Sequence, residues 1–230
     1  MAEQKTKPSV PKDFEYEVHR VPDDLLAPLR SSWDRLPQDP YLTGGYRFRR
    51  LTRFRVDAAG ITPRPQRPVF QKSEHNHLFG DVPREFELIE EEVVAHPAFQ
   101  ALCEFYFEHL PMPREGLWLR AHQIRVVHDA AAGLVGRPDP EGPHREGERL
   151  VLGIMPVTMG NVVPGQTRLF REGESSACFE TTLNAGDLLL VNDANFLHTT
   201  EPFVRQTAPR AWRDIMLLTV TGEESDGTIL

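Results

Sequence analysis

Two histidines and one carboxylate in the second half of the chain have the residue types and the order of a metal site. His144 and Glu146 stand two positions apart in the segment Pro-Glu-Gly-Pro-His-Arg-Glu-Gly, residues 140–147. Alternate residues of an extended chain point to the same side, so the imidazole and the carboxylate could reach one ion. His198 adds a second imidazole after a tight turn and a predicted buried strand at 186–193. Two histidines and one carboxylate leave three positions of an octahedral Fe(II) open, which suits a chelating co-substrate and O₂.

An arginine follows the second histidine in the last apolar run of the chain. The planar fork of Arg213 can pair with both oxygens of a carboxylate, which suits it to hold the far end of a chelating acid. Arg210 is a rival three residues earlier, but Arg213 lies inside the apolar run, on the same side as Ile215 and Leu217. The alternative role for Arg213 is an ion pair with Asp214 or with a surface carboxylate.

In these residues the sequence resembles the bacterial 2-oxoglutarate/Fe(II) dioxygenases typified by L-isoleucine 4-hydroxylase, which act on free amino acids. The resemblance covers roughly the C-terminal half, from His-Gln-Ile-Arg at 122–125 to Trp-Arg-Asp at 212–214. It implies that His144, Glu146 and His198 bind the iron and that Arg213 binds 2-oxoglutarate. Two departures stand out. The family usually has His-x-Asp, whereas the carboxylate here is Glu146. Relatives also tend to carry a Gly-Gly pair where this chain has Val-Pro-Gly at 163–165.

The resemblance also implies an activity. It is the Fe(II)- and 2-oxoglutarate-dependent hydroxylation, by O₂, of an aliphatic C–H bond in a small substrate, a free L-amino acid or a derivative, with ascorbate as a supporting reductant. Glu146 favours hydroxylation over halogenation, since halogenating relatives leave that ligand position to chloride. Desaturation or ring closure stays open. Two other classes stay open as well, a cupin-like barrel that binds a metal or an anion without turnover, and a hydrolytic zinc enzyme.

Two further groups of polar residues could bind ligands. Gln123 and Arg125 share one face of a predicted strand, and Arg125 could either hold the carboxylate of a substrate or satisfy a buried acid. His75 and His77 form a second His-x-His pair, but no partner stands at zinc-like spacing, which favours a solvated loop.

The elements around the triad form a β-rich pattern. Seven short apolar or alternating runs are separated by turn residues, without the helical spacers of a parallel sheet. These runs lie at 117–128, 150–159, 166–170, 177–183, 187–192, 196–203 and 212–221. The pattern predicts a mainly β fold with some α, in which a double-stranded β-helix (jelly-roll, cupin-like) forms the catalytic core at 116–230.

The first 115 residues are expected to pack on this barrel, so that the whole chain makes one structural domain. Apolar spacing predicts helices at 25–36 and 97–110, the second with Pro97 at its first position. Alternation of basic with apolar residues at 45–51 predicts a half-exposed strand, and residues 1–20 are expected to be a loose lead-in.

Composition limits the function classes. The chain has 230 residues and a formal net charge of −8, with a pI near 5.6, so binding to nucleic acid through a basic face is not expected. No apolar segment has the length of a membrane span and no signal peptide is visible, so we expect no membrane partner and a cytoplasmic protein. Cys103 and Cys178 are expected to be buried, reduced thiols.

Overall fold

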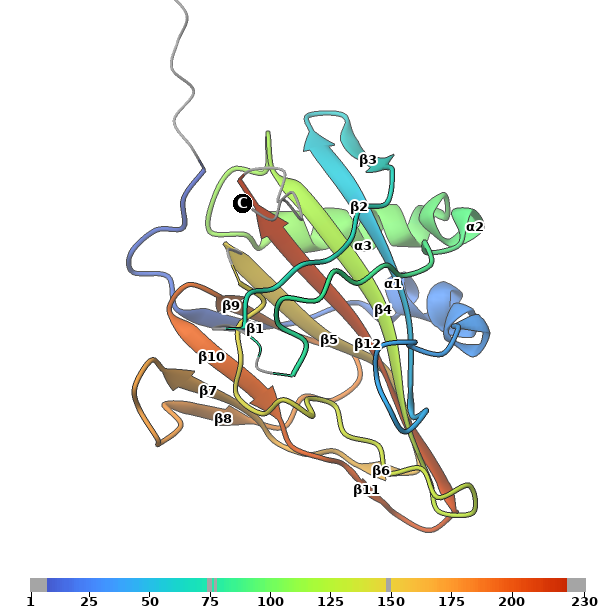
Figure 1. Ribbon diagram of the computed structural model, residues 1–230. Helices are drawn as coiled ribbons and strands as arrows, with labels where there is room; N and C mark the ends of the chain where they lie inside the picture. Colours follow the sequence, from blue (N-terminus) through green and yellow to red (C-terminus); the bar gives the residue numbers. More distant parts are fainter. Residues whose placement is uncertain (1–7, 74–75, 77, 148–149, 223–230) are drawn as a thin grey trace, which may run out of the picture.

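A seven-stranded antiparallel sheet forms the larger layer of the protein, in a computed structural model that describes residues 8–73, 76, 78–147 and 150–222 (Figure 1). Its strand order is β1-β9-β5-β12-β4-β2-β3. The strands are β1 Tyr16–Arg20, β2 Arg47–Asp57, β3 Gly60–Arg64, β4 Trp118–Asp129, β5 Val151–Gly160, β9 Asp187–Asn192 and β12 Arg210–Thr221. Strands from both halves of the chain therefore pair directly in one sheet.

A smaller sheet faces the first and completes the double-stranded β-helix. It has the order β10-β7-β8, with β7 at Thr167–Arg171, β8 at Phe179–Thr181 and β10 at Phe196–Thr200. A two-stranded ribbon pairs β6, Val162–Val163, with β11, Val204–Arg205. All seven runs predicted as strands are confirmed, although the run at 196–203 ends as a strand at Thr200. The predicted jelly-roll fold is therefore confirmed.

The helices pack on the face of the large sheet that points away from the small sheet (Figure 1). They are α1 Asp23–Leu26, the 3₁₀ helix η1 Ala27–Arg35, α2 Glu91–Val94 and α3 Pro97–Glu108. The helix predicted at 25–36 is thus mostly 3₁₀, and Pro28, which cannot donate a backbone hydrogen bond, lies at its start. In the described parts of the chain, no helix is long and apolar enough to cross a membrane.

Three predictions about exposure or order are wrong. Residues 16–20 are not a loose lead-in, because they form β1 and pair with β9. The strand at 45–51 is not half-exposed, since it begins β2 and both Arg47 and Arg49 are buried. Cys103 is buried as expected, whereas Cys178 is exposed.

Candidate metal centre and its cavity

The backbone brings His144 and His198 together from the two sides of the fold. The segment before β5 forms an isolated antiparallel bridge with β10, in which the N–H of each histidine donates to the carbonyl of the other, at 3.0 and 2.9 Å. Residues paired across such a bridge project to the same side. The two imidazole rings consequently lie with their centroids 4.3 Å apart.

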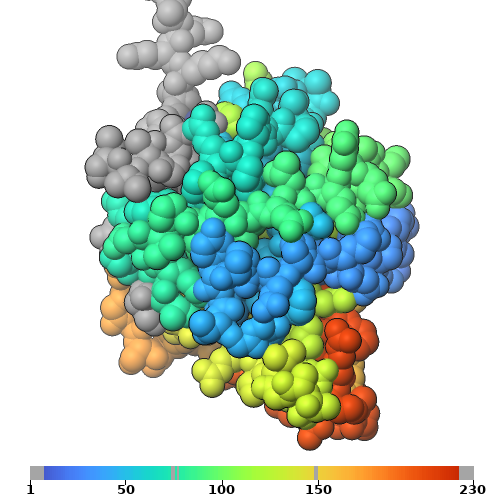
Figure 2. All heavy atoms as spheres, turned by 45° about the vertical axis from the view of Figure 1, so that its right-hand side comes forward, coloured from blue at the N-terminus to red at the C-terminus, as the bar shows by residue number. Residues whose placement is uncertain are grey.

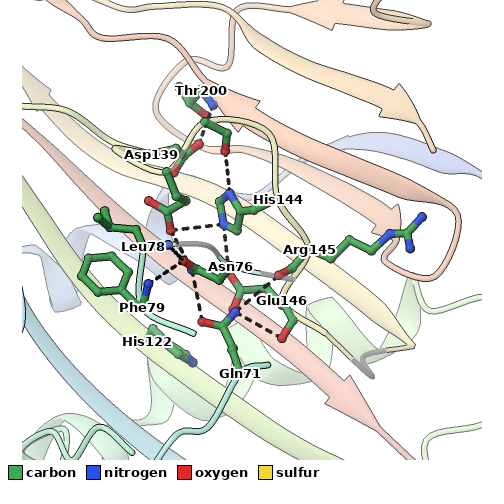
Figure 3. A network of polar contacts seen from close by, with 12 residues as sticks. Gln71, Asn76, Leu78, Phe79, His122, Asp139, His144, Arg145, Glu146 and Thr200 are labelled. Carbon is green, nitrogen blue, oxygen red and sulfur yellow. Dashed lines mark hydrogen bonds and ion pairs between the residues drawn. The ribbon is translucent and has the colours of Figure 1, made fainter. Parts of the chain in front are cut away.

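A turn at Gly142 sets the orientation of the first imidazole. Gly142 has a φ of 72°, a value that favours glycine, and its carbonyl oxygen lies 2.9 Å from His144 Nδ1. A carbonyl can only accept, so Nδ1 carries a hydrogen, and Nε2 is the nitrogen left to bind a metal once the ring is neutral. That Nε2 faces Glu146 Oε1 at 3.8 Å and Glu141 Oε1 at 3.7 Å (Figure 3 labels His144 and Glu146). Metal-binding histidines are typically held in this way through their second nitrogen.

One ligand atom each from His144, Glu146 and His198 lie within 4.8 Å of one another. Both histidines are buried and Glu146 is nearly so, and the backbone N–H of Glu146 donates to Asp193 Oδ1 at 3.2 Å. Two imidazoles and one carboxylate are a donor set that non-haem Fe(II) accepts, with positions left open. The residues present therefore fit an iron ion, as the sequence predicted.

The charges of the metal-free triad differ from residue to residue. Burial lowers the pKa of His144, but the carboxylates of Glu146, Glu141 and Asp139 outweigh it and raise the pKa to about 10. Burial raises the pKa of Glu146, but His144 and the other nearby histidines outweigh it and hold the pKa well below its usual range. Burial and the charge of His144 lower the pKa of His198 to about 3. The triad thus contains an imidazolium–carboxylate pair and one neutral imidazole.

Arg213 lies in the wall of the same cavity. The cavity is lined by His144, Glu146, His198 and Arg213, and also by Ile215 and Leu217 of β12, which share its face of the strand. The predicted strand parity is therefore confirmed. Arg213 is 1% exposed, and burial lowers its pKa to about 10, so the guanidinium keeps its charge at neutral pH.

The rival roles for this arginine do not fit the structure. Arg210 is exposed and does not line the cavity. Asp214 points to the opposite face of β12, where its carboxylate accepts hydrogen bonds from Arg125 at 2.6 and 2.8 Å. An ion pair between Arg213 and Asp214 is thus excluded.

Gln123 and Arg125 do not reach the cavity. Ile124, between them on β4, lines it, so both neighbours point to the helical side of the sheet. Gln123 Nε2 donates to Ser32 Oγ at 2.7 Å, and Arg125 pairs with Asp214 and Asp34. The alternative in which Arg125 satisfies a buried acid is the one that the structure supports. His75 and His77 lie outside the described residues.

Sequence reasoning missed the basic wall of the cavity. Arg47 and Arg49 of β2 line it together with Arg84, which a backbone bridge with Val69 holds in place. The signal that could have found two of them is the alternation of arginine at 47 and 49, which on its own predicts only a half-exposed strand. Asp139 and Glu141 are two further lining residues that carry charge.

The comparisons with known proteins agree with this geometry. The family model described as 2OG-Fe dioxygenase matches residues 30–219, whereas no curated protein matches the chain. Among solved structures, the chain is similar to a bsmA homolog from Methylobium petroleophilum PM1, with 28% identity and a TM-score of 0.71 over 90% of this chain and 82% of that one.

Two other solved structures share the fold at lower identity. IDO from Bacillus thuringiensis is 18% identical, with a TM-score of 0.69 over 87% of each chain. The Fe(II)/(alpha)ketoglutarate-dependent dioxygenase TqaL is 16% identical, with a TM-score of 0.65 over 90% of this chain and 82% of that one. Since the family model spans most of the chain, including the triad and Arg213, the protein belongs to the 2OG-Fe dioxygenase family, whose members are enzymes that use Fe(II), 2-oxoglutarate and O₂.

Proposed function

We propose that the enzyme hydroxylates an aliphatic C–H bond of a free L-amino acid or a close derivative. His144, Glu146 and His198 hold the iron, and Arg213 holds the distal carboxylate of 2-oxoglutarate. The observation that carries the assignment is one cavity in which the three clustered ligand atoms and a buried, charged arginine share the wall.

The side chains of the site have separate tasks. The bound Fe(II) supplies the activation of O₂, which is coupled to the decarboxylation of 2-oxoglutarate to succinate and CO₂ and puts the second oxygen atom into the substrate. Arg213 orients the co-substrate, because its fork can donate two parallel hydrogen bonds to one carboxylate. Gly142 fixes the tautomer of His144, and the apolar side chains of Ile215 and Leu217 restrict water around the reacting groups.

Glu146 supports hydroxylation as the reaction. A carboxylate at this position fills a site that halogenating relatives leave to chloride. The side chain is one methylene longer than the aspartate usual in the resembling family, and its carboxylate still comes within 3.8 Å of His144 Nε2. The longer side chain is thus compatible with the compact donor cluster.

A product screen tests the proposal. Each of the twenty amino acids is incubated with the enzyme, Fe(II), ascorbate and 2-oxoglutarate, and the products are analysed by mass spectrometry. We expect one class of amino acid to gain one oxygen atom, with matching O₂-dependent release of succinate. Loss of two hydrogens would indicate desaturation or ring closure instead. Turnover that persists without O₂ would contradict the proposal and favour a hydrolytic zinc enzyme.

A further inference from the structure

Three buried arginines gather on the cavity wall formed by β2 and the loop at 69–86. Arg47, Arg49 and Arg84 are 6, 7 and 3% exposed. The ring of Phe79 lies 5.3 Å from Arg47 Cζ and 5.0 Å from Arg84 Cζ, so these two guanidiniums share one ring. The ring of Phe86 in turn lies 4.4 Å from Arg49 Cζ and 5.9 Å from Arg84 Cζ.

Carboxylates pair directly with little of this cluster, although Asp39 and Glu146 act on the charges of Arg49 and Arg84 from beyond ion-pair distance. Arg47 Nε donates to Asp39 at 2.8 Å, but neither Arg49 nor Arg84 has an ion pair with a carboxylate in the described residues. Arg49 instead contacts His122 Nδ1, and Arg84 donates to the amide oxygen of Gln71. Burial and the charges of Arg47 and Arg84 lower the pKa of Arg49 to about 9, which still leaves it charged at neutral pH.

Each arginine of the cluster also has an unused donor. Arg47 Nη2, Arg49 Nε and Arg84 Nε are buried without a hydrogen-bond partner in the described structure. Buried cations and donors are costly to leave unpaired, so a wall that carries them is suited to an anion that arrives from solution. Because the residues are already held in place by the aromatic rings and the strand, little ordering is needed on binding.

Of the acids that line the cavity, Glu141 has a carboxylate oxygen without a hydrogen-bond partner in the described residues. Glu141 Oε1 accepts from Asn76 Nδ2 at 3.2 Å, while its Oε2 is buried and has no partner in the described residues. Figure 3 shows Asn76 beside Gln71, whose amide oxygen accepts hydrogen bonds from both Asn76 and Arg84. The acid and the basic wall therefore belong to one polar network.

An outer cleft adjoins this wall and shares Arg84 with the inner cavity. Arg84 and Phe79, together with Tyr46, line this cleft of about 640 Å³. The segments around residues 41–46, 78–84 and 133–140 form the cleft, and Figure 2 shows blue, teal and yellow-green parts of the chain meeting on that face. The exposed Arg137 and the buried Arg84 both line this cleft, so its charge favours the entry of a negatively charged molecule.

Resting on the proposed oxidation of an amino acid, we propose that the substrate is an acidic L-amino acid, whose two carboxylates bind Arg49 and Arg84 and whose ammonium faces Glu141. A neutral amino acid would pair with one of the two guanidiniums and leave the other without a directly paired carboxylate. An acidic one matches both cations and the free carboxylate oxygen. Arg213 is not needed for this, because it serves the co-substrate in the proposed function.

The test compares acids with their own amides. Binding of L-aspartate, L-asparagine, L-glutamate and L-glutamine to the anaerobic enzyme loaded with Fe(II) and 2-oxoglutarate is measured by calorimetry. One of the acids should bind at least about tenfold more tightly than its amide, since the amide loses a charge-assisted hydrogen bond. The same acid should gain one oxygen atom in air, with O₂-dependent release of succinate.

Two variants assign the preference to the wall. In Arg84→Gln and in Arg49→Gln the ratio of acid to amide affinity should fall toward one, while the KM for 2-oxoglutarate stays the same. Arg64→Gln, which removes an exposed charge on β3, should leave the ratio unchanged. The ratio does not depend on how much of the protein folds. If one of the two variants does not fold at all, the other still gives the ratio.

The outcomes separate this inference from the proposed function. If a neutral amino acid such as isoleucine binds more tightly and is hydroxylated, the acidic substrate class is wrong and the amino-acid oxygenase remains. If an acid binds preferentially through Arg84 but is not oxidised, the anion site stands and the proposed reaction is wrong. Equal affinity for acid and amide in the wild-type enzyme would overturn the inference outright.

Discussion

The guanidinium of Arg213 is almost completely buried in the cavity wall, where Asp139 is the carboxylate that acts on its charge. Its Nε makes no hydrogen bond with a described residue. A structural arginine would be paired, because an uncompensated buried cation destabilises a fold. A role in binding the carboxylate of the co-substrate would account both for the burial of Arg213 and for the absence of a partner at its Nε in the described residues.

Replacement of Arg213 by lysine tests this role. Arg213→Lys keeps the charge but loses the planar fork, so the KM for 2-oxoglutarate should rise about tenfold or more, as expected for one lost charge-assisted hydrogen bond. The melting temperature without 2-oxoglutarate should hardly change. A lower melting temperature with an unchanged KM, measured by steady-state kinetics and thermal unfolding, would indicate a structural ion pair instead.

Arg125 provides the opposite case. Its guanidinium pairs with the buried carboxylate of Asp214 on the helical side of the sheet, away from the cavity. Arg125→Gln should therefore lower the free energy of unfolding by about 1–3 kcal/mol, since it leaves a buried acid without its cation. The KM for the amino acid should stay at the wild-type value. A raised KM with unchanged stability would restore Arg125 as a substrate ligand.

Metal binding at His144 should depend on pH. The surrounding carboxylates outweigh burial and raise the pKa of His144 to about 10 in the metal-free protein, so the imidazole is protonated at pH 7. A metal ion needs the neutral imidazole, so its binding must release that proton. The affinity for Co(II) should then rise by about tenfold per pH unit between about pH 7 and 9. Calorimetry in two buffers of different ionisation enthalpy counts the released proton, and an affinity independent of pH would contradict this.

At the scale of the elements, the 3₁₀ helix η1 supports the strands that carry the site. Trp33 is buried, and its Nε1 donates to the carbonyl of Ile124 on β4 at 3.2 Å and to that of Ile215 on β12 at 3.3 Å. These two residues are partners in the β4–β12 ladder, next to a register shift between β12 and β5 at Asp214/Ile215. The indole thus satisfies the backbone from the helical side at the point where Arg213 and Ile215 line the cavity.

Loss of the indole N–H should affect both the stability of the sheet and the cavity on its other face. Trp33→Phe should lower the free energy of unfolding by about 1–3 kcal/mol, because two buried carbonyls lose a donor. The KM for 2-oxoglutarate should rise a few-fold through displacement of β12. Trp118→Phe, at the start of β4 and away from the cavity, is the matched control. A KM that stays unchanged in Trp33→Phe would show that η1 stabilises the sheet without positioning Arg213.

For the whole molecule, the barrel could be predicted from the sequence because turn residues separate its apolar strands. The candidate triad and Arg213 could be predicted because each lies on a strand or beside a turn whose side-chain direction follows from parity. The basic wall could not be predicted. Burial of Arg47 and Arg49 depends on the packing of Phe79 and Phe86 over β2, and no local pattern encodes a contact between such distant segments.

Side-chain alternation along a strand shows which residues share a face, but not what that face contacts. Gln123 and Arg125 share a face, as predicted, but the sequence does not say whether that face meets the cavity or the helices. The structure decides it through η1, which covers the large sheet and receives both side chains at Ser32 and Asp34. The β1 strand was missed for a similar reason, since its pairing partner β9 lies at the other end of the chain.

Anaerobic visible absorption tests the central claim most directly. Fe(II) and 2-oxoglutarate added together to the wild-type protein without O₂ should produce a weak metal-to-ligand charge-transfer band, which requires chelation at an iron held by His144, Glu146 and His198. His144→Ala should abolish the band, and Arg213→Lys should shift its formation to higher 2-oxoglutarate concentrations. No band in the wild-type protein, or an undiminished band in a folded His144→Ala variant, would contradict the account.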